Sequence, residues 1–394
     1  MQRDVMTRKL EGFGTTIFAE MSALAVETAA INLGQGFPDT DGPATVLDAA
    51  IAAIRGGVNQ YPPGPGDPDL LAAIAEHQQR WYGIELDPRT QIVVTAGATE
   101  ALAGALLGML DAGDGVVVFE PMYDSYQAGI ALAGAVAQPV LLSPRDDGRY
   151  GFDAAALRAA ITDRTKLLLL NTPHNPTGKV FDRAELELIA SLAIEHDLIV
   201  VTDEVYEHLV FDGAAHVPIA TLPGMFERTL TISSGGKTFH TTGWKIGWMS
   251  GPADLVGAAK TAKQFLTYVN GAPFQPAIAA GLRMPDDHFE RLRLTLQTAR
   301  DHLVDGLDRA GFTTLRPEAT YFVTVDIRPI AGDERGTDFC RRLPHVAGVV
   351  AVPCEVFYAN PDHGRHLVRF ACCKQLDLID RAASQLAGAF GATT

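Results

Sequence analysis

The chain has 394 residues, of which 47% are hydrophobic and 20% are charged. It is therefore long enough for two domains or one large core, and its composition is that of a globular protein rather than a disordered one. The formal net charge of −15 argues against nucleic-acid and anionic-membrane partners, because both require a basic surface.

The N-terminal residues, the longest apolar runs and the cysteines indicate where the protein is located but not what it does. The first nine residues lead into no apolar segment of the signal-peptide kind, and no apolar run approaches the roughly 20 residues of a membrane helix, so we expect a cytoplasmic protein. The four cysteines, Cys340, Cys354, Cys372 and Cys373, have no metal-ligand spacing. They are expected to be free core thiols, and the sequence motifs predict no metal site.

Short apolar runs alternate with amphipathic stretches from about residue 46 to 280. This pattern predicts strand–helix units on a largely parallel sheet, with strands at 91–95, 115–119, 166–171, 198–203, 229–233 and 245–250. Helix starts are marked by Asp67 before Pro68 and by Asp182 three residues before Glu185, which are capping signals. We interpret residues 46–280 as a large domain.

The rest of the chain has a different pattern. A long polar helix at 289–310, strands at 321–327, 348–353 and 366–371, and a final helix from residue 376 predict a smaller α+β domain over residues 281–394. The first 45 residues contain no complete unit, so we expect them to join the small domain and to pack across both.

Lys237 follows the apolar run 229–232 in the segment Ser233-Ser-Gly-Gly-Lys-Thr-Phe239. A lysine at a strand end, among small residues that let a ring approach the backbone, can form a Schiff base with an aldehyde cofactor. A solvated surface lysine is the commoner outcome, so this motif alone is weak evidence.

A candidate phosphate site precedes a predicted helix. Gly97, Ala98 and Thr99 lie between a strand and a helix of small residues, where backbone N–H groups bind anions. Ser234 and Lys245 could supply a hydroxyl and a positive charge to the same phosphate. A glycine needed only for packing, and a lysine that extends into solvent, are the alternatives.

Three polar residues follow two other strands. Asp203 ends the apolar run 198–202, and a carboxylate in such surroundings needs a partner; the protonated nitrogen of a pyridine ring is one, and a helix cap is another use. Asn175, in a rigid turn rich in proline, could donate to a phenolic oxygen of the same cofactor or only bond its own backbone. Tyr206 could reach that oxygen too.

Two further residues could complete a site. Tyr123 follows a strand and could stack on a cofactor ring, although buried aromatic residues in such places more often belong to the core. Arg369 is a cation in an otherwise apolar strand, and its planar guanidinium suits bidentate capture of a carboxylate. A structural ion pair is the alternative.

The order and spacing of these residues resemble those of the class I aminotransferases of the fold-type-I pyridoxal phosphate superfamily. The matching positions are Asn175 in Asn-Pro-Thr-Gly, Asp203 and Tyr206 in Asp-Glu-Val-Tyr, Ser234, Lys237, Lys245 and Arg369. The resemblance covers essentially the whole chain. It implies an α/β fold with a mostly parallel seven-stranded sheet between helices, a smaller α+β domain, and pyridoxal 5'-phosphate as cofactor.

Within that superfamily, residues 32–39, 59–66, 242–248 and 270–275 are most similar to a branch that holds kynurenine and glutamine transaminases and succinyldiaminopimelate aminotransferases. By that resemblance, Tyr61 would reach the phosphate of a partner subunit in a homodimer. Gly36 would offer its N–H to the substrate carboxylate, Asn175 and Arg369 would help to bind the substrate, and Phe18 would line the pocket.

The activity implied by the resemblance is transfer of an amino group between glutamate and an oxo acid, with N-succinyl-2-amino-6-oxopimelate as the expected acceptor. Broad transamination of kynurenine, glutamine or methionine, or β-elimination from cysteine conjugates, remains open. A non-catalytic regulator is disfavoured because 45 residues before the large domain are too few for a DNA-binding module. A dehydrogenase is disfavoured because no Gly-x-Gly-x-x-Gly follows a strand.

Overall fold

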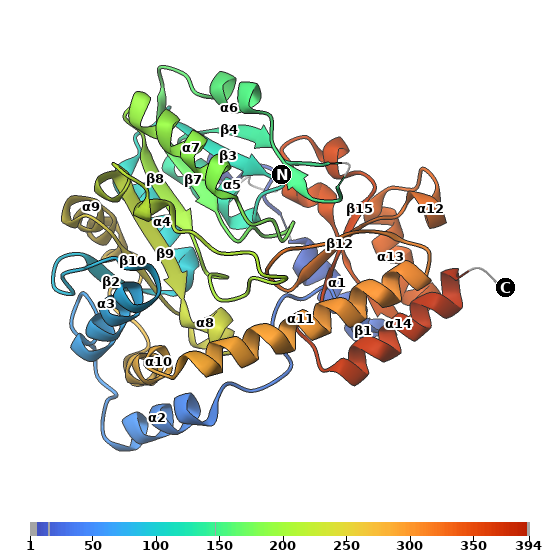
Figure 1. Ribbon diagram of the computed structural model, residues 1–394, viewed down its shortest axis with the longest axis horizontal. Helices are drawn as coiled ribbons and strands as arrows, with labels where there is room; N and C mark the ends of the chain where they lie inside the picture. The colour runs from blue at the N-terminus through green and yellow to red at the C-terminus, as the bar shows by residue number, and fades with distance from the viewer. Residues whose placement is uncertain (1–5, 15, 146, 392–394) are drawn as a thin grey trace, which may run out of the picture.

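The computed structural model describes residues 6–14, 16–145 and 147–391. Its two main sheets lie side by side. In Figure 1 the long helix α11 (Asp286–Arg309) reaches from the part that contains the larger sheet to the part that contains the smaller one. The seven-stranded sheet has the order β2-β10-β9-β8-β7-β3-β4, and only β10 is antiparallel to its neighbours. Its strands are β2 (Ile92–Ala96), β3 (Gly115–Glu120), β4 (Val136–Leu141), β7 (Thr165–Asn171), β8 (Ile199–Asp203), β9 (Thr229–Ser234) and β10 (Ile246–Ser250).

Both faces of this sheet are covered by helices. In β7, Leu167 and Leu169 belong to the cluster formed with α4 (Gly97–Met109), α5 (Asp124–Ala133) and α9 (Ala253–Lys263). Leu168 and Leu170 face the opposite cluster with α6 (Ala154–Ala160) and α7 (Arg183–Glu195). A strand buried on both faces reads as a continuous apolar run rather than an alternating one, as in the sequence here.

The remaining helices next to this sheet are α2 (Ala44–Arg55), α3 (Pro68–Tyr82), α8 (Gly235–Thr238) and α10 (Gln275–Leu282). The expected start signals are confirmed. The Asp67 carboxylate accepts hydrogen bonds from the N–H groups of Asp69 and Leu70 at the start of α3. Asp182 and Glu185 form a capping box at the start of α7.

The second sheet is antiparallel, with the order β11-β12-β15-β14. Its strands are β11 (Thr313–Leu315), β12 (Phe322–Asp326), β14 (Val352–Pro353) and β15 (Leu367–Ala371), and nearby helices are α12 (Arg328–Ala331), α13 (Gly336–Ala347) and α14 (Leu376–Phe390). The single strand expected at 348–353 is wrong, because the chain forms β13 (Val349–Val350) and β14, which pair in different sheets. A short hairpin joins β5 (Ser143–Pro144) to β6 (Tyr150–Gly151).

The N-terminal segment contacts both parts of the molecule. Helix α1 (Ile17–Thr28) packs in the cluster of the smaller sheet, and β1 (Ile31–Asn32) pairs in parallel with β13. Farther along, the Thr40 hydroxyl bonds the His240 ring, which follows α8. The domain boundaries at 45 and 280 stay a prediction. Among the described residues, no helix is both long and apolar enough to cross a membrane.

Candidate active site

The site lies where the central strands end. The strands β7, β8 and β9 run in parallel and end at Asn171, Asp203 and Ser234, so their carboxyl ends meet at one edge of the sheet, the usual place for ligands in open α/β folds. A cavity of about 380 Å³ opens there. Its lining contains all of the predicted site residues except Tyr61: Phe18, Gly36, Gly97, Ala98, Thr99, Tyr123, Asn175, Asp203, Tyr206, Ser234, Lys237, Lys245 and Arg369.

Lys237 is held by the short helix α8, directly after β9. Its Nζ lies 5.7 Å from the ring centroid of Tyr206 and 5.8 Å from that of Tyr321. Burial lowers the pKa of the Lys237 amine, because a charged ammonium is poorly solvated there. A larger fraction of the neutral amine, which is the nucleophilic form, is therefore present.

Asp203 is a buried carboxylate, 4% exposed, at the end of β8. The Tyr126 hydroxyl donates to its Oδ2 at 2.7 Å, and the Val205 N–H donates to its Oδ1 at 3.3 Å. Burial raises its pKa. Among the described residues no lysine or arginine forms an ion pair with Asp203, so a cationic N–H group within the cavity would be a favourable ligand for it.

The turn into α4 is shaped to bring a ligand close to the backbone. Gly97 has φ +74°, a conformation that favours glycine. A Cβ there would lie 3.2 Å from Lys245 Nζ, and a Cβ on Gly247 would lie 2.6 Å from the Gly97 carbonyl carbon. Free N–H groups at the start of this 13-residue helix, with the Lys245 ammonium beside them, form an anion site.

Lys245 does not belong to a strand, as the expected strand at 245–250 had it. The residue has φ +55° and precedes β10, which begins at Ile246. The Asn270 side chain donates to its carbonyl oxygen at 3.0 Å. This left-handed turn is what directs Lys245 toward Gly97, next to which its Nζ lies.

Arg369 is 2% exposed, in the middle of β15. Its Nη1 donates to Asn175 Oδ1 at 2.9 Å, and its Cζ lies 3.9 Å from the Phe322 ring centroid and 5.3 Å from that of Phe18. Its Nε has no hydrogen-bond partner among the described residues. No carboxylate of the described chain pairs with this guanidinium, so its spare donors are available to a carboxylate that enters the cavity.

The other predicted residues complete the wall. Tyr206 is buried and packs edge to face on Tyr321 with 5.3 Å between ring centroids; burial raises its pKa. Burial also raises the pKa of Tyr123 to about 12. The Gly36 carbonyl accepts a hydrogen bond from the Tyr321 hydroxyl at 2.8 Å.

Three residues lie apart from this cavity. Tyr61 is 82% exposed and contacts only the ring of Tyr268 among the aromatic residues described, at 5.7 Å. Arg328 and Arg335, two arginines that could bind a distal carboxylate if they lay near the cavity, pair with acidic side chains of their own neighbourhood. Neither of these arginines lines the cavity.

Sequence reasoning missed several residues of the site. Tyr126 lies in the first turn of α5, three positions after the N-cap residue Tyr123, and this spacing could have drawn attention to its hydroxyl. Asn171 lines the cavity, and its side-chain oxygen accepts the Asn175 N–H at 2.7 Å. Phe322 could not have been distinguished from a core residue, because it lies in a buried strand beside Val323 and Val325, which belong to the core.

The sequence matches the profile of the family described as Aminotransferase class I and II over residues 28–386. A probable N-succinyldiaminopimelate aminotransferase of Mycobacterium tuberculosis is 50% identical over 388 residues, which cover 96% of this chain and 97% of that protein. A kynurenine–oxoglutarate transaminase of Dictyostelium discoideum is 37% identical over 415 residues, covering 96% and 95%.

Solved structures agree with these sequence matches. The structure of N-succinyldiaminopimelate aminotransferase from Mycobacterium tuberculosis superposes with a TM-score of 0.95 at 50% identity, covering 98% of this chain and 100% of that one. The expected α/β fold with its large, mostly parallel sheet is confirmed. This chain belongs to the class I and II aminotransferases, has the fold-type-I architecture, and is an aminotransferase.

Proposed function

We propose that this chain is a pyridoxal 5'-phosphate enzyme whose cofactor occupies the cavity around Lys237. The observation that carries the proposal is Asp203, a buried carboxylate without a cationic partner in the described chain, whose side chain lines the same cavity as the Lys237 amine. A pyridine nitrogen that carries a proton satisfies such a carboxylate. The glycine turn at Gly97, with Lys245 beside it, fits the phosphate end of the same molecule.

Different residues of the cavity would bind different parts of the cofactor. Gly97, Ala98, Thr99, Ser234 and Lys245 would hold the phosphate. Asp203 would face the ring nitrogen, Asn175 and Tyr206 the phenolic oxygen, and Tyr123 a ring face. Lys237 would bind the aldehyde carbon. When bound, pyridoxal phosphate carries the amino group between the two substrates and accepts the electron pair released at the α-carbon.

The chain's own groups would do the proton chemistry. Lys237 Nζ, once free, is the base that takes the proton from the α-carbon of the amino acid, and its lowered pKa keeps part of it in the basic form. Arg369 would hold the α-carboxylate with its spare donors, and the Gly36 N–H would support it. Holding the carboxylate orients the α-carbon hydrogen toward the lysine. This speeds the proton transfer by positioning the two groups and not by making the α-carbon hydrogen more acidic.

For the substrates, we propose glutamate as amino donor and N-succinyl-2-amino-6-oxopimelate as acceptor, the chemistry of lysine and diaminopimelate synthesis. The support is the 50% identity to a probable N-succinyldiaminopimelate aminotransferase over nearly the whole of both chains. A cytoplasmic location accords with that role and stays a prediction.

One feature of the cavity favours the alternative, a broad transaminase for kynurenine, glutamine or methionine, or a cysteine-conjugate β-lyase. Its only positively charged lining residues among those described are Lys237, Lys245 and Arg369, and each already has a role. The remaining wall includes Phe18 and Phe37, which suit an apolar or aromatic side chain better than a distal carboxylate.

A homodimer is part of the proposal, with Tyr61 reaching the phosphate of the partner subunit. Its exposure of 82% leaves the phenol free to make such a contact. Sedimentation should show a dimer, and Tyr61→Phe should weaken cofactor binding. Unaltered cofactor affinity in Tyr61→Phe would count against the contact.

A single-turnover experiment tests the proposed substrates. The protein is loaded with pyridoxal phosphate, its visible absorbance is bleached with glutamate, and recovery is followed with each oxo acid in turn. Recovery fastest by orders of magnitude with the succinylated acid supports the lysine-pathway assignment. Comparable recovery with aromatic and sulfur-containing oxo acids supports the broad transaminase, and pyruvate and ammonia from a cysteine conjugate without any acceptor support elimination.

A further inference from the structure

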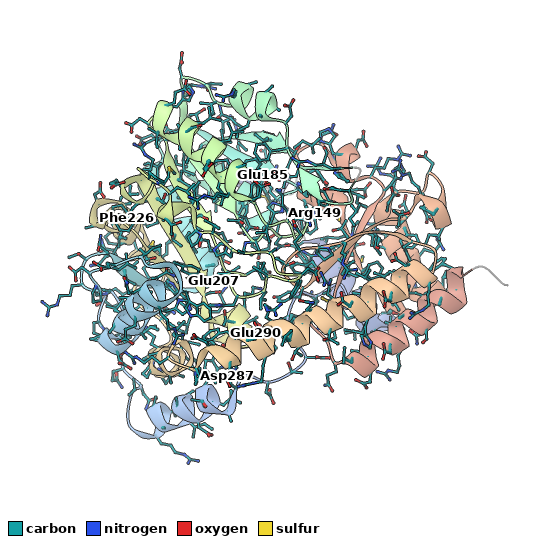
Figure 2. The ribbon with its side chains drawn as sticks, in the orientation of Figure 1. Arg149, Glu185, Glu207, Phe226, Asp287 and Glu290 are labelled. Carbon is teal, nitrogen blue, oxygen red and sulfur yellow. The ribbon has the colours of Figure 1, made fainter. Side chains whose placement is uncertain are left out.

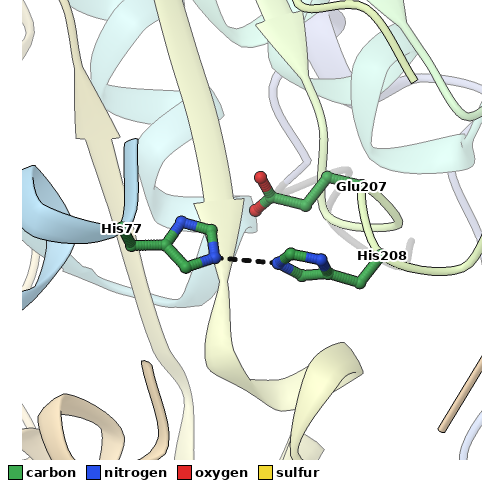
Figure 3. A group of neighbouring side chains, drawn as sticks. All are labelled: His77, Glu207 and His208. Carbon is green, nitrogen blue, oxygen red and sulfur yellow. Dashed lines mark hydrogen bonds between the residues drawn. The ribbon is translucent and has the colours of Figure 1, made fainter. Parts of the chain in front are cut away.

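A buried group of side chains beside the turn that follows β8 has no part in the proposed reaction. His77 in α3 and Glu207 and His208 in the turn after β8 each offer a ligand atom, and these atoms all lie within 4.8 Å of one another. The three residues are 2%, 6% and 9% exposed. Figure 3 shows the Glu207 carboxylate directed toward the space between the two imidazole rings.

The hydrogen bonds of this group leave buried atoms unsatisfied. The two Nε2 atoms of His77 and His208 are 2.8 Å apart, so one ring donates to the other. Ser233 donates to Glu207 Oε1 at 2.6 Å. His77 Nδ1 is buried and has no partner among the described residues, and Glu207 Oε2 is buried with no hydrogen bond of good geometry, although the Tyr82 phenol lies beside that carboxylate. Unsatisfied buried polar atoms are costly, and two at one place call for a ligand.

The charges in this group are also unbalanced in the direction that a cation would correct. Glu207 is buried and forms no ion pair with any lysine or arginine of the described chain. The 2.8 Å contact between the two Nε2 atoms requires one ring to accept through an unprotonated nitrogen, so at least one imidazole is neutral, which is the form that binds a metal ion.

The surrounding groups do not supply the missing charge. His216 is already paired with Glu204 at 2.8 Å, and both are buried. A second buried carboxylate so close to Glu207 makes an added positive charge more favourable still.

A route from solvent exists. A cavity of about 510 Å³ is lined by Glu207 and His208 and, toward the start of α11, by Asp286, Asp287 and Glu290. Glu207, Asp287 and Glu290 are labelled in Figure 2. The three outer carboxylates are each bridged to an arginine, so Glu207 is the one carboxyl group among the described lining residues without an ionic partner.

We propose that His77, Glu207 and His208 form a binding site for a divalent transition-metal ion of the zinc class, with a water from this cavity as the fourth ligand. Two imidazoles and one carboxylate are a common zinc donor set, whereas magnesium and calcium prefer oxygen ligands alone. The ligands come from positions 130 residues apart in the sequence, which is why no spacing motif announces them.

Only a small adjustment of the group is needed. Two nitrogens bound to one tetrahedral zinc at about 2.0–2.1 Å lie about 3.3 Å apart, so the rings would have to separate by about 0.5 Å from their present contact. Glu207 and His208 follow Asp203 and Tyr206 in the same turn. A bound ion would therefore tie α3 to the segment that carries two active-site residues, and it would act as a structural brace rather than as a catalytic group.

Zinc binding tests the proposal with the full-length protein and with no reading of enzyme activity. The protein is first dialysed against a chelator, and Zn²⁺ is then titrated in competition with a chromogenic chelator. The protein should bind one equivalent of zinc per chain in this titration, and the bound zinc should raise its melting temperature. His208→Asn and Glu207→Gln should each weaken the site by more than about 100-fold, since even loss of a group that only orients a ligand costs 10–100-fold.

The matched control is His302→Asn, which removes an exposed histidine paired with Asp380 on the surface of α11 and should leave zinc affinity unchanged. X-ray absorption at the zinc edge of the wild-type protein should show two imidazole ligands, and this readout stands even if a variant fails to fold. Absence of a retained equivalent, wild-type affinity in Glu207→Gln, or an absorption spectrum without imidazole scattering would overturn the site.

Discussion

Replacing Arg369 with methionine should abolish most of the activity without destabilising the protein. The guanidinium is buried but has no carboxylate partner in the described chain, and its main hydrogen bond is the one to Asn175 at 2.9 Å. Removing it costs that bond from a charged group, worth about 1.5–3 kcal/mol, and this loss is offset by relief of a buried unpaired charge. The free energy of unfolding of the substrate-free protein should therefore fall by no more than about 1 kcal/mol, or rise.

The effect on activity follows from the role proposed for the spare donors. A buried guanidinium–carboxylate pair that loses one partner costs about 3–5 kcal/mol. At about 1.4 kcal/mol for each tenfold change, kcat/KM should fall by roughly 10²- to 10⁴-fold. Steady-state kinetics with glutamate and denaturant unfolding measure the two quantities on the same preparation.

Arg300→Met is the matched control. Arg300 is as deeply buried, but its guanidinium is paired with Asp212 at 2.7 Å and with Asp301 at 2.8 Å. Because both carboxylates are more than one-third exposed, we expect a loss of stability of about 1–3 kcal/mol rather than the full value for a buried pair. The kcat/KM of the folded fraction should not change.

The opposite pattern would exclude a carboxylate-binding role for Arg369. If Arg369→Met lost more than about 2 kcal/mol of stability while kcat/KM stayed within about tenfold of wild type, Arg369 would be a structural ion and not the carboxylate-binding group.

Three other predictions follow from the site. Lys237→Met should stabilise the cofactor-free protein at neutral pH. The gain should shrink as pH rises from the lowered folded-state pKa of Lys237 toward 10.5, because over that range the folded wild-type chain binds fewer protons than the unfolded chain and so becomes more stable. A difference in unfolding free energy that does not change with pH would contradict this prediction. Gly247→Ala should weaken cofactor binding by about 10- to 100-fold in an absorbance titration, since overpacking costs about 1–3 kcal/mol, whereas Gly257→Ala, where a Cβ meets nothing within 4 Å, should not. Tyr126→Phe removes the 2.7 Å hydrogen bond to Asp203 and should lower cofactor affinity by roughly 10- to 100-fold; unchanged affinity would show that Asp203 needs no such support.

The parts of the fold that the sequence predicts are those with a strong apolar signal. Six strands of the large sheet were expected near their observed positions, because they are buried and apolar. The seventh, β4, was missed. It lies at the edge of the sheet, contains Pro139, and is largely accessible along its length, so neither an apolar run nor a strict alternation marks it.

The site could be predicted as far as its residues follow strand ends. Asp203, Asn175 and Lys237 each come shortly after a strand of the parallel sheet, and parallel strands bring their carboxyl ends together. The support that these residues receive from elsewhere was not visible. The Tyr126 hydroxyl on Asp203, and the close approach of Phe322 to Arg369, depend on how α5 and β12 pack, which no local pattern specifies. For the same reason, no motif announces the His77–Glu207–His208 group.

The most direct test of the proposed function is to find where pyridoxal phosphate is attached. The protein is loaded with the cofactor, reduced with borohydride, digested, and analysed by mass spectrometry of its peptides. The pyridoxyl phosphate mass should be found on the peptide that contains Lys237, in about one equivalent per chain, and should be lost in Lys237→Ala. Attachment to another lysine, or no attachment under conditions in which the protein is folded, would contradict the proposed role of Lys237.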